Sequence, residues 1–149
     1  MRKEHRPDGS AGFNTELEGQ SSTQLELGAK WRAAALGLLE DGFTVVLAGR
    51  RAEPLNALVD QAASRGQTAL AVPTDVGKKD EVHALAQAAL KRFGRIDTWV
   101  NNAGISIFGR AEEVSEEDNH RLFQTNFWGV VNGSMEAVKH LKEQGGALI

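Results

Sequence analysis

The sequence contains no cysteine and no tyrosine in its 149 residues. The absence of cysteine excludes disulfides, thiolate metal sites and cysteine nucleophiles, and it fits a protein of the reducing cytoplasm. Its histidines and acids show no metal-ligand spacing, so no metal site is predicted. The absence of tyrosine excludes a phenol as general acid or base in any active site that this chain forms alone.

Long apolar runs and an excess of basic charge are also missing. No run approaches the length of a membrane helix and no charged-then-apolar leader is present, so neither a membrane partner nor secretion is predicted. Lys plus Arg is 17 and Asp plus Glu is 20, which gives a net charge of −3 and argues against binding to nucleic acid. The length suits one domain with a substantial core.

The first 28 residues contain few apolar side chains. Only 6 of these 28 are apolar, against 55 of the remaining 121. A segment of this composition cannot offset the entropy of ordering its backbone. Residues 1–28 are therefore predicted to be a disordered or loosely ordered tail, and residues 29–149 to form the folded domain.

Strand and helix patterns alternate from residue 29 onward. Helical spacing over residues 31–40, 53–65 and 80–93 alternates with short apolar runs at 43–48, 68–73 and 96–101. A long helix is predicted over 115–142, opened by a capping-box-like pattern, and residues 147–149 begin another strand. This alternation predicts an α/β fold, a Rossmann-like doubly wound parallel sheet. Such sheets bind ligands at the carboxyl ends of their strands.

Unusual residues follow three of the predicted strands. Arg50 and Arg51 follow Gly49, with no acid beside them; guanidiniums suit a phosphate, although two exposed arginines opening a helix are the simpler alternative. Asp75 follows the next strand, where it can also merely cap a helix. Two amides and a glycine (NNAG, residues 101–104) follow the third, and allow close backbone approach to a ligand, although a plain turn also favours this composition.

The segments VVLAGRR, TDV, IDTWVNNAG and TNFWGVVNGS, in this order and spacing, resemble the short-chain dehydrogenase/reductase family. The resemblance covers about residues 32–149, and NNAG is its most specific mark. It implies an oxidoreductase that transfers hydride between a nicotinamide cofactor and a carbonyl or alcohol. The implied cofactor is NADP in preference to NAD, because Arg50, with or without Arg51, would meet the 2′-phosphate.

The same resemblance implies the remaining site residues. By that resemblance Asp75 and Val76 contact adenine, and Asn126 supports the family's proton relay. The segment beside the nicotinamide-side ribose is Asn102, Ala103 and Gly104.

Parts of the family pattern are not found. The glycine positions of its TGxxxGxG loop, which binds the pyrophosphate, hold Leu25, Leu27, Ala29 and Trp31. The strand before that loop would fall near residues 17–23, which are polar. The family's catalytic Ser and its Tyr-x-x-x-Lys do not appear. The sequence therefore predicts an incomplete fold, without the first strand, the glycine-rich loop and the C-terminal half. It also predicts a weak affinity for NADP, because the pyrophosphate loop is missing, and a fragment that is inactive as this chain alone.

Two further expectations follow from the missing strand and from the long helix. Without a central strand, residues 43–48 and 96–101 would each lack a neighbour, unless residues 23–27 insert as a substitute. The alternative function is a non-enzymatic nucleotide-binding or interaction protein that uses helix 115–142 as a dimer surface, for a homo-oligomer or for association with an intact family member. The competing interpretation assigns the apolar residues of that helix mostly to the sheet-facing core: Leu122, Phe123, Phe127, Val130, Val131, Val138 and Leu141.

Overall fold

A computed structural model of the chain describes residues 10–14 and 22–149. Five strands form one parallel sheet in the order β3-β2-β1-β4-β5. They are β1 (Ser10–Asn14), β2 (Thr44–Gly49), β3 (Ala69–Pro73), β4 (Thr98–Asn101) and β5 (Ala147–Leu148). This arrangement confirms the predicted doubly wound parallel sheet.

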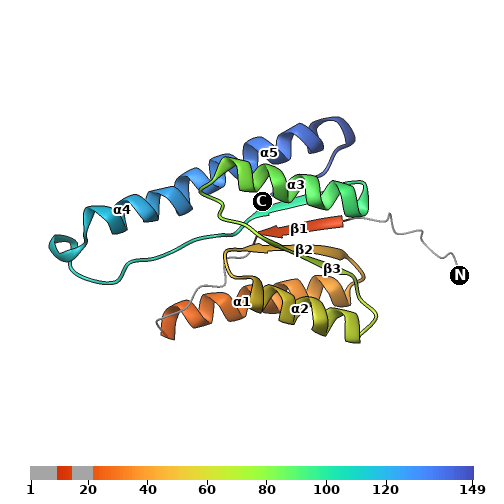
Figure 1. Cartoon of the computed structure of the whole chain (residues 1–149), viewed down its shortest axis with the longest axis horizontal. Helices are drawn as coiled ribbons and strands as arrows, with labels where there is room; N and C mark the ends of the chain where they lie inside the picture. The colour runs from red at the N-terminus through yellow and green to blue at the C-terminus, as the bar shows by residue number, and fades with distance from the viewer. Residues whose placement is uncertain (1–9, 15–21) are drawn as a thin grey trace, which may run out of the picture.

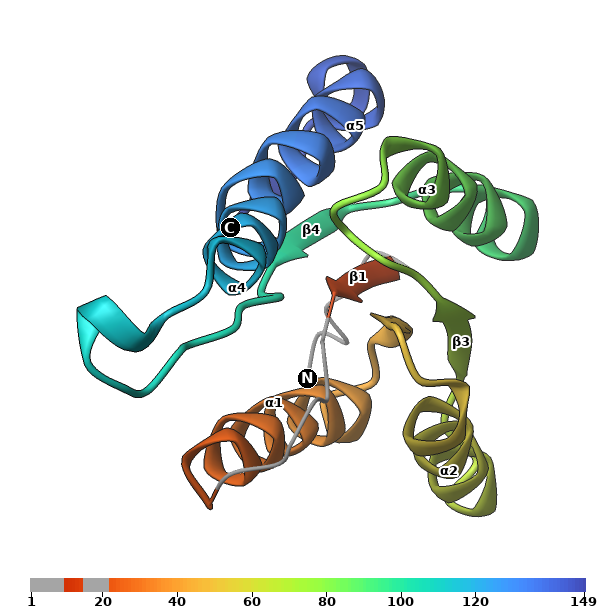
Figure 2. The same cartoon turned by 60° about the vertical axis from the view of Figure 1, so that its left-hand side comes forward.

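Helices cover both faces of the sheet (Figures 1 and 2). One face carries α1 (Ser22–Glu40) and α2 (Ala52–Ser64), and the other carries α3 (Lys79–Phe93) and α5 (Gly129–Gln144). Between β4 and α5 lie a short turn η1 (Ala111–Glu113), α4 (Glu116–Phe123) and η2 (Gln124–Trp128). No helix in the described ranges combines the length and apolar character needed to cross a bilayer.

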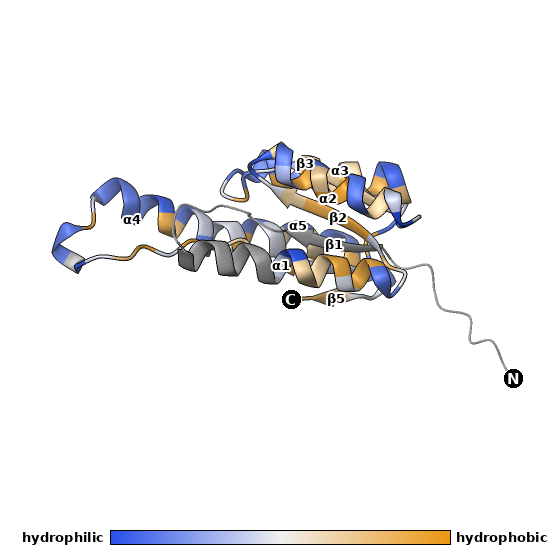
Figure 3. Cartoon of the chain, turned by 90° about the horizontal axis from the view of Figure 1, so that it is seen from below, coloured by the Kyte–Doolittle hydropathy of each residue, from blue (hydrophilic) through white to orange (hydrophobic). Residues whose placement is uncertain are grey.

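The core lies on both sides of β2, which is buried from Val45 onward. Because side chains alternate along a strand, Val45 and Leu47 pack with α1 and α2, whereas Val46 and Ala48 pack with α3 and α5. Figure 3 shows β2 in the colour of hydrophobic residues and most of α4 in that of hydrophilic residues. The β-branched run that predicted a strand buried on both faces is confirmed.

The central position of the sheet differs from the sequence expectation. β1 occupies it, with Ser10 to Asn14 paired in parallel to β2, and Ala11 to Asn14 paired to β4. The expectation of a missing first strand, with unpaired neighbours on either side, is therefore wrong. Strand pairing uses backbone N–H and C=O groups, so a segment without an apolar run can still form it. The expected loose tail over 1–28 lies in large part outside the described residues.

The substitute strand expected at residues 23–27 is also wrong, since these residues belong to α1. α1 includes all four positions that the family pattern would fill with the glycine-rich loop: Leu25, Leu27, Ala29 and Trp31. Residues 15–21, which connect β1 to α1, lie outside the described residues.

The single helix expected over 115–142 is divided by a change of helical pitch. Ser115 caps α4 as predicted, since its Oγ accepts a hydrogen bond from the Asp118 N–H at 3.0 Å. η2 is a turn of π-helix in which the Gly129 N–H donates to the Gln124 carbonyl, five residues back. Such turns insert one extra residue into a helix and often occur at functional sites. No residue pattern in the sequence predicted it.

Candidate functional site

The carboxyl ends of β2, β3 and β4 open onto one edge of the sheet, and the predicted site residues follow them. Arg50 comes directly after β2, Asp75 follows β3, and Asn102 follows β4. A cleft of about 650 Å³ opens here between the loops and the segment α4–η2. Of the predicted residues, Arg50 and Asp75 line it; Arg51 is exposed at the start of α2, outside the lining. The opposite wall consists of Glu116, Glu117, His120, Arg121, Gln124 and Thr125.

Two carboxylates, one from the loop and one from α3, hold the loop after β3. The Asp75 Oδ1 accepts a hydrogen bond from the Gly77 N–H at 3.0 Å, and the Asp75 N–H donates to the Glu81 Oε2 at 2.7 Å. That backbone bond, with the Lys78 ammonium 2.9 Å away, lowers the pKa of the Glu81 carboxyl. α3 begins at Lys79, so Asp75 forms an Asx-type turn before the helix and does not cap it.

The two asparagines after Val100 have different roles. Asn101 joins β4 to α5, because its Oδ1 accepts from the Trp99 Nε1 at 3.1 Å and its Nδ2 donates to the Ser134 Oγ at 3.1 Å. The Asn102 Nδ2 is buried and has no hydrogen-bond partner within the described ranges. A buried donor left unsatisfied costs about 1–3 kcal/mol. An acceptor on a bound ligand would remove that cost, so this edge of the sheet fits a polar ligand such as a cofactor ribose.

Asn126 holds the loop that follows β4. Its Oδ1 accepts from the Ile105 N–H, and its Nδ2 donates to the Ile105 carbonyl, both at 2.8 Å. A Cβ added to Gly104 would lie 3.7 Å from the same Oδ1. Asn126 is exposed and lies in η2, within the extra turn. The structure therefore places Asn126 beside the predicted segment 102–104. Asp75 lines the cleft, whereas Val76 is 3% exposed and packs in the core, outside the cleft lining.

Sequence reasoning missed the residues that face Asp75 from the helices. Gln124 and Thr125 line the cleft, and Gln124 and Asn132 contact the loop after β3. Their positions depend on the π-helical turn. A helical pattern with uniform pitch does not show which side chains face this loop, so no signal in the sequence identified them.

A family model described as short chain dehydrogenase matches residues 31–149. The chain belongs to the short-chain dehydrogenase family. Among curated relatives, it is 49% identical over 112 residues to the uncharacterized oxidoreductase YxnA of Bacillus subtilis, covering 74% of this chain and 32% of that protein. It is 37% identical over 115 residues to the hydroxynaphthalene reductase-like protein Arp2 of Metarhizium robertsii, covering 76% and 43%.

Solved structures of two dehydrogenases are similar across nearly the whole chain. An alcohol dehydrogenase from Thermococcus sibiricus, complexed with 5-hydroxy-NADP, is 28% identical with a TM-score of 0.78, covering 94% of this chain and 56% of that one. A short-chain type dehydrogenase/reductase from Mycobacterium marinum is 27% identical with a TM-score of 0.80, covering 94% and 53%. This short-chain dehydrogenase chain thus spans about a third to a half of the length of the curated relatives it matches.

Proposed function

We propose that the chain is the cofactor-binding part of a cytoplasmic, NADP-dependent oxidoreductase that acts on a carbonyl or alcohol. The observation that carries this proposal is the set of polar groups at the carboxyl edge of the sheet. Arg50 and Asp75 share one cleft there, and the buried Asn102 Nδ2 has no partner among the described residues. The relatives named as oxidoreductases, and the NADP derivative in the Thermococcus sibiricus structure, support the same assignment.

Each predicted residue is assigned a part in holding the cofactor. Arg50, assisted by Arg51, would hold the 2′-phosphate, since guanidiniums bind phosphate through paired N–H donors. Asp75 and Val76 would contact the adenine, and Asn126 keeps the loop after β4 in place through Ile105. When bound, the cofactor supplies the hydride. The ribose beside the nicotinamide would meet the segment Asn102, Ala103 and Gly104.

We expect the chain to bind NADP about tenfold more tightly than NAD, because no carboxylate lies at residues 49–51 to accept a free 2′-hydroxyl. Replacing Arg50 by alanine should bring the two affinities together. Isothermal titration with each cofactor measures this. Arg65→Ala is the matched control, since Arg65 pairs with Glu40 on the surface at 3.0 Å, away from the cleft. An equal or higher affinity for NAD in the unmodified chain would contradict the assignment.

We expect no turnover of carbonyl substrates by this chain alone, because the family's proton donor is a tyrosine and the sequence has none. General acid–base catalysis contributes roughly 10²–10⁴-fold in rate. NADPH oxidation, followed by absorbance with a panel of ketones and aldehydes, tests this. The variant Arg50→Ala identifies activity from contaminating enzymes, because such activity is the same in preparations of the variant and of the unmodified chain. A rate that falls in the variant would disprove inactivity.

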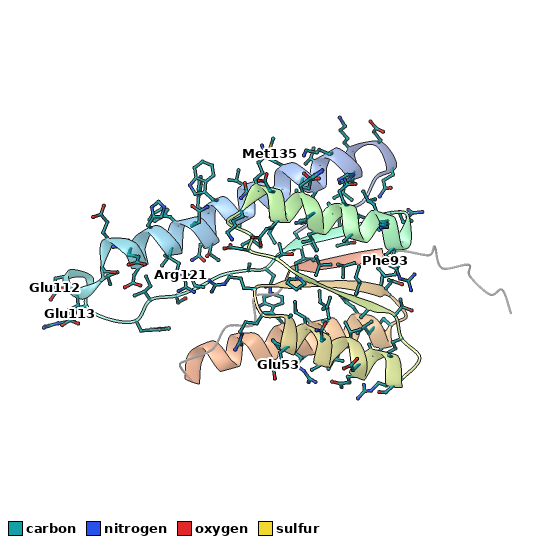
Figure 4. The ribbon with its side chains drawn as sticks, viewed as in Figure 1. Glu53, Phe93, Glu112, Glu113, Arg121 and Met135 are labelled. Atoms are coloured by element: carbon teal, nitrogen blue, oxygen red, sulfur yellow. The ribbon has the colours of Figure 1, made fainter. Side chains whose placement is uncertain are left out.

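A second candidate function is self-association through the helical segment α4–η2–α5. The interpretation of its apolar residues as mostly sheet-facing core is wrong: Leu141 is buried, but Phe123 is 61% exposed and Phe127 is 53% exposed. Figure 4 shows Met135 on the side of α5 that points away from the sheet. Exposed apolar side chains gathered on one segment are typical of an interaction surface. We call the exposed apolar side chains of this segment the row: Phe123, Phe127, Trp128, Val130, Met135 and Val138.

We expect the chain to form a dimer at micromolar concentration, with this row facing the same row of a second copy. Phe127→Glu should return it to a monomer in analytical ultracentrifugation, because burying a charge at an interface costs several kcal/mol. Phe108→Glu is the control, since Phe108 is 68% exposed on the loop after β4, outside the row. A monomeric unmodified chain, or equal effects of the two substitutions, would rule out this surface.

A further inference from the structure

Two amide side chains on the helical segment α4–η2–α5 bond to the backbone of the loop after β3. The Gln124 Nε2 donates to the Gly77 carbonyl at 2.6 Å. The Asn132 Nδ2 donates to the Val76 carbonyl at 3.0 Å. These are adjacent peptide units, directly after Asp75. The loop that is expected to contact adenine is thus hydrogen-bonded to η2 and α5.

The π-helical turn explains how both amides reach the same loop. Gln124 and Asn132 are eight positions apart, and in a uniform α-helix their directions would differ by about 80°. One residue more in the turn reduces this difference to about 20°, so the two side chains lie on one face. Figure 1 shows α4 and α5 as one nearly continuous rod, along which η2 provides this shift.

Packing at two glycines keeps the loop and the helix in close contact. A Cβ added to Gly77 would lie 2.7 Å from the Gln124 Cγ, and one added to Gly129 would lie 2.6 Å from the Val76 Cγ2. Val76, Gly77 and Gly129 are all buried. The loop is therefore fixed by a close steric fit in addition to the two hydrogen bonds.

We propose that Gln124 and Asn132 are positioning residues for cofactor binding. They hold the Val76 and Gly77 carbonyls, so that Asp75 and Val76 keep the backbone conformation that receives the adenine end of the cofactor. This inference rests on the proposed function for the identity of the ligand, but the restraint on the loop is independent of it. Asn132 lies outside the cleft lining, whereas Gln124 belongs to it, so a direct readout of the loop is needed to separate the restraint from a contact between Gln124 and the cofactor.

The test uses the full chain with Gln124→Met and Asn132→Leu combined. Both replacements keep approximate size and remove the donor, so the expected loss is about tenfold in affinity for adenosine 2′,5′-bisphosphate, which corresponds to about 1.4 kcal/mol. The matched control is Gln144→Met. Gln144 belongs to the same helix α5 and its Nε2 also donates to a backbone carbonyl, that of Ile96, at the opposite end of β4.

A second measurement tests the restraint on the loop separately from the identity of the cofactor. Hydrogen exchange of the Gly77 and Lys78 amides, which donate within the loop to the Asp75 Oδ1 and the Asp75 carbonyl, should accelerate in the double variant and not in Gln144→Met. Unchanged exchange at these amides would overturn the positioning role, whatever the affinity. Faster exchange in a chain that never binds the bisphosphate would support the restraint and refute the proposed cofactor. An equal loss of affinity in Gln144→Met would show that the bonds of Gln124 and Asn132 contribute only to the overall stability of the chain, and it would overturn their positioning role.

Discussion

Replacing Gly133 by alanine is expected to lower the free energy of unfolding by about 3 kcal/mol, from overpacking and a lost hydrogen bond. A Cβ at this position would lie 2.1 Å from the Asn101 Oδ1 and 2.9 Å from the Trp99 Nε1. Asn101 can only move aside by giving up its bonds to Trp99 and Ser134. Trp99 is 3% exposed, so its indole N–H would then be buried without an acceptor.

Gly133→Ala is expected to destabilise the chain because the gain in helix propensity is smaller than the loss from the steric clash and the broken hydrogen bond. Alanine favours a helix interior over glycine by about 1 kcal/mol, which is less than the expected steric and hydrogen-bonding loss. Gly37 in α1 is the matched control, because a Cβ there meets nothing within 4 Å. Gly37→Ala should stabilise the chain by up to about 1 kcal/mol. Urea unfolding of both variants measures the difference; two changes of the same sign would show that the contact with Asn101 does not limit this position.

Glu136→Gln is expected to destabilise the chain by about 3 kcal/mol at pH 7, and by progressively less as the solution becomes acidic. Glu136 is 4% exposed between α3 and α5. Burial alone would raise its pKa, but hydrogen bonds from Lys139, His83 and His140 outweigh burial and lower it from 4.5 to about 2. The histidine nitrogens lie 2.9 Å (His83) and 3.2 Å (His140) from the Glu136 Oε1.

The pH window follows from the direction of that shift. A carboxyl whose pKa is lower in the folded state stabilises the fold above its unfolded value, and this contribution disappears as the pH falls from about 4.5 to about 2. The difference between the unmodified chain and Glu136→Gln, measured by denaturant unfolding across that range, should therefore shrink. Glu40→Gln is the control, because an exposed pair such as Glu40 and Arg65 is worth roughly 0–1 kcal/mol. A difference that stays constant down to pH 2 would disprove the role of the charge.

The parts of the fold that the sequence predicted are those with strong local patterns. β2 is a β-branched run buried on both faces, and Gly94 ends α3 with a φ of 81°, as a glycine at a helix end allows. The edge of the sheet to which Arg50, Asp75 and Asn102 belong follows from the parallel topology alone. Their assignment to individual parts of a cofactor remains a prediction.

The parts that the sequence did not predict depend on partners far along the chain. Ser10–Asn14 has no strand pattern of its own, and its place is set by backbone pairing with β2 and β4. The apolar spacing of η2 and α5 shows which residues share a face, but it does not show whether anything covers that face, so the sequence does not reveal that Phe127 is exposed. The π-helical turn that directs Gln124 and Asn132 to one loop likewise has no local signature.

The central position of β1 also determines the width of the edge at which a ligand would bind. Within the described residues, β2–β3 and β4–β5 are joined in the sheet only through β1, which precedes the residues matched by the family model. Neighbouring strands lie about 4.8 Å apart, so β1 separates the ends of β2 and β4 by roughly 10 Å. β1 is therefore a spacer. Without it, β2 and β4 would be direct neighbours in the sheet, and Arg50 and Asn102 would lie one strand width closer together. The edge would then suit a shorter ligand.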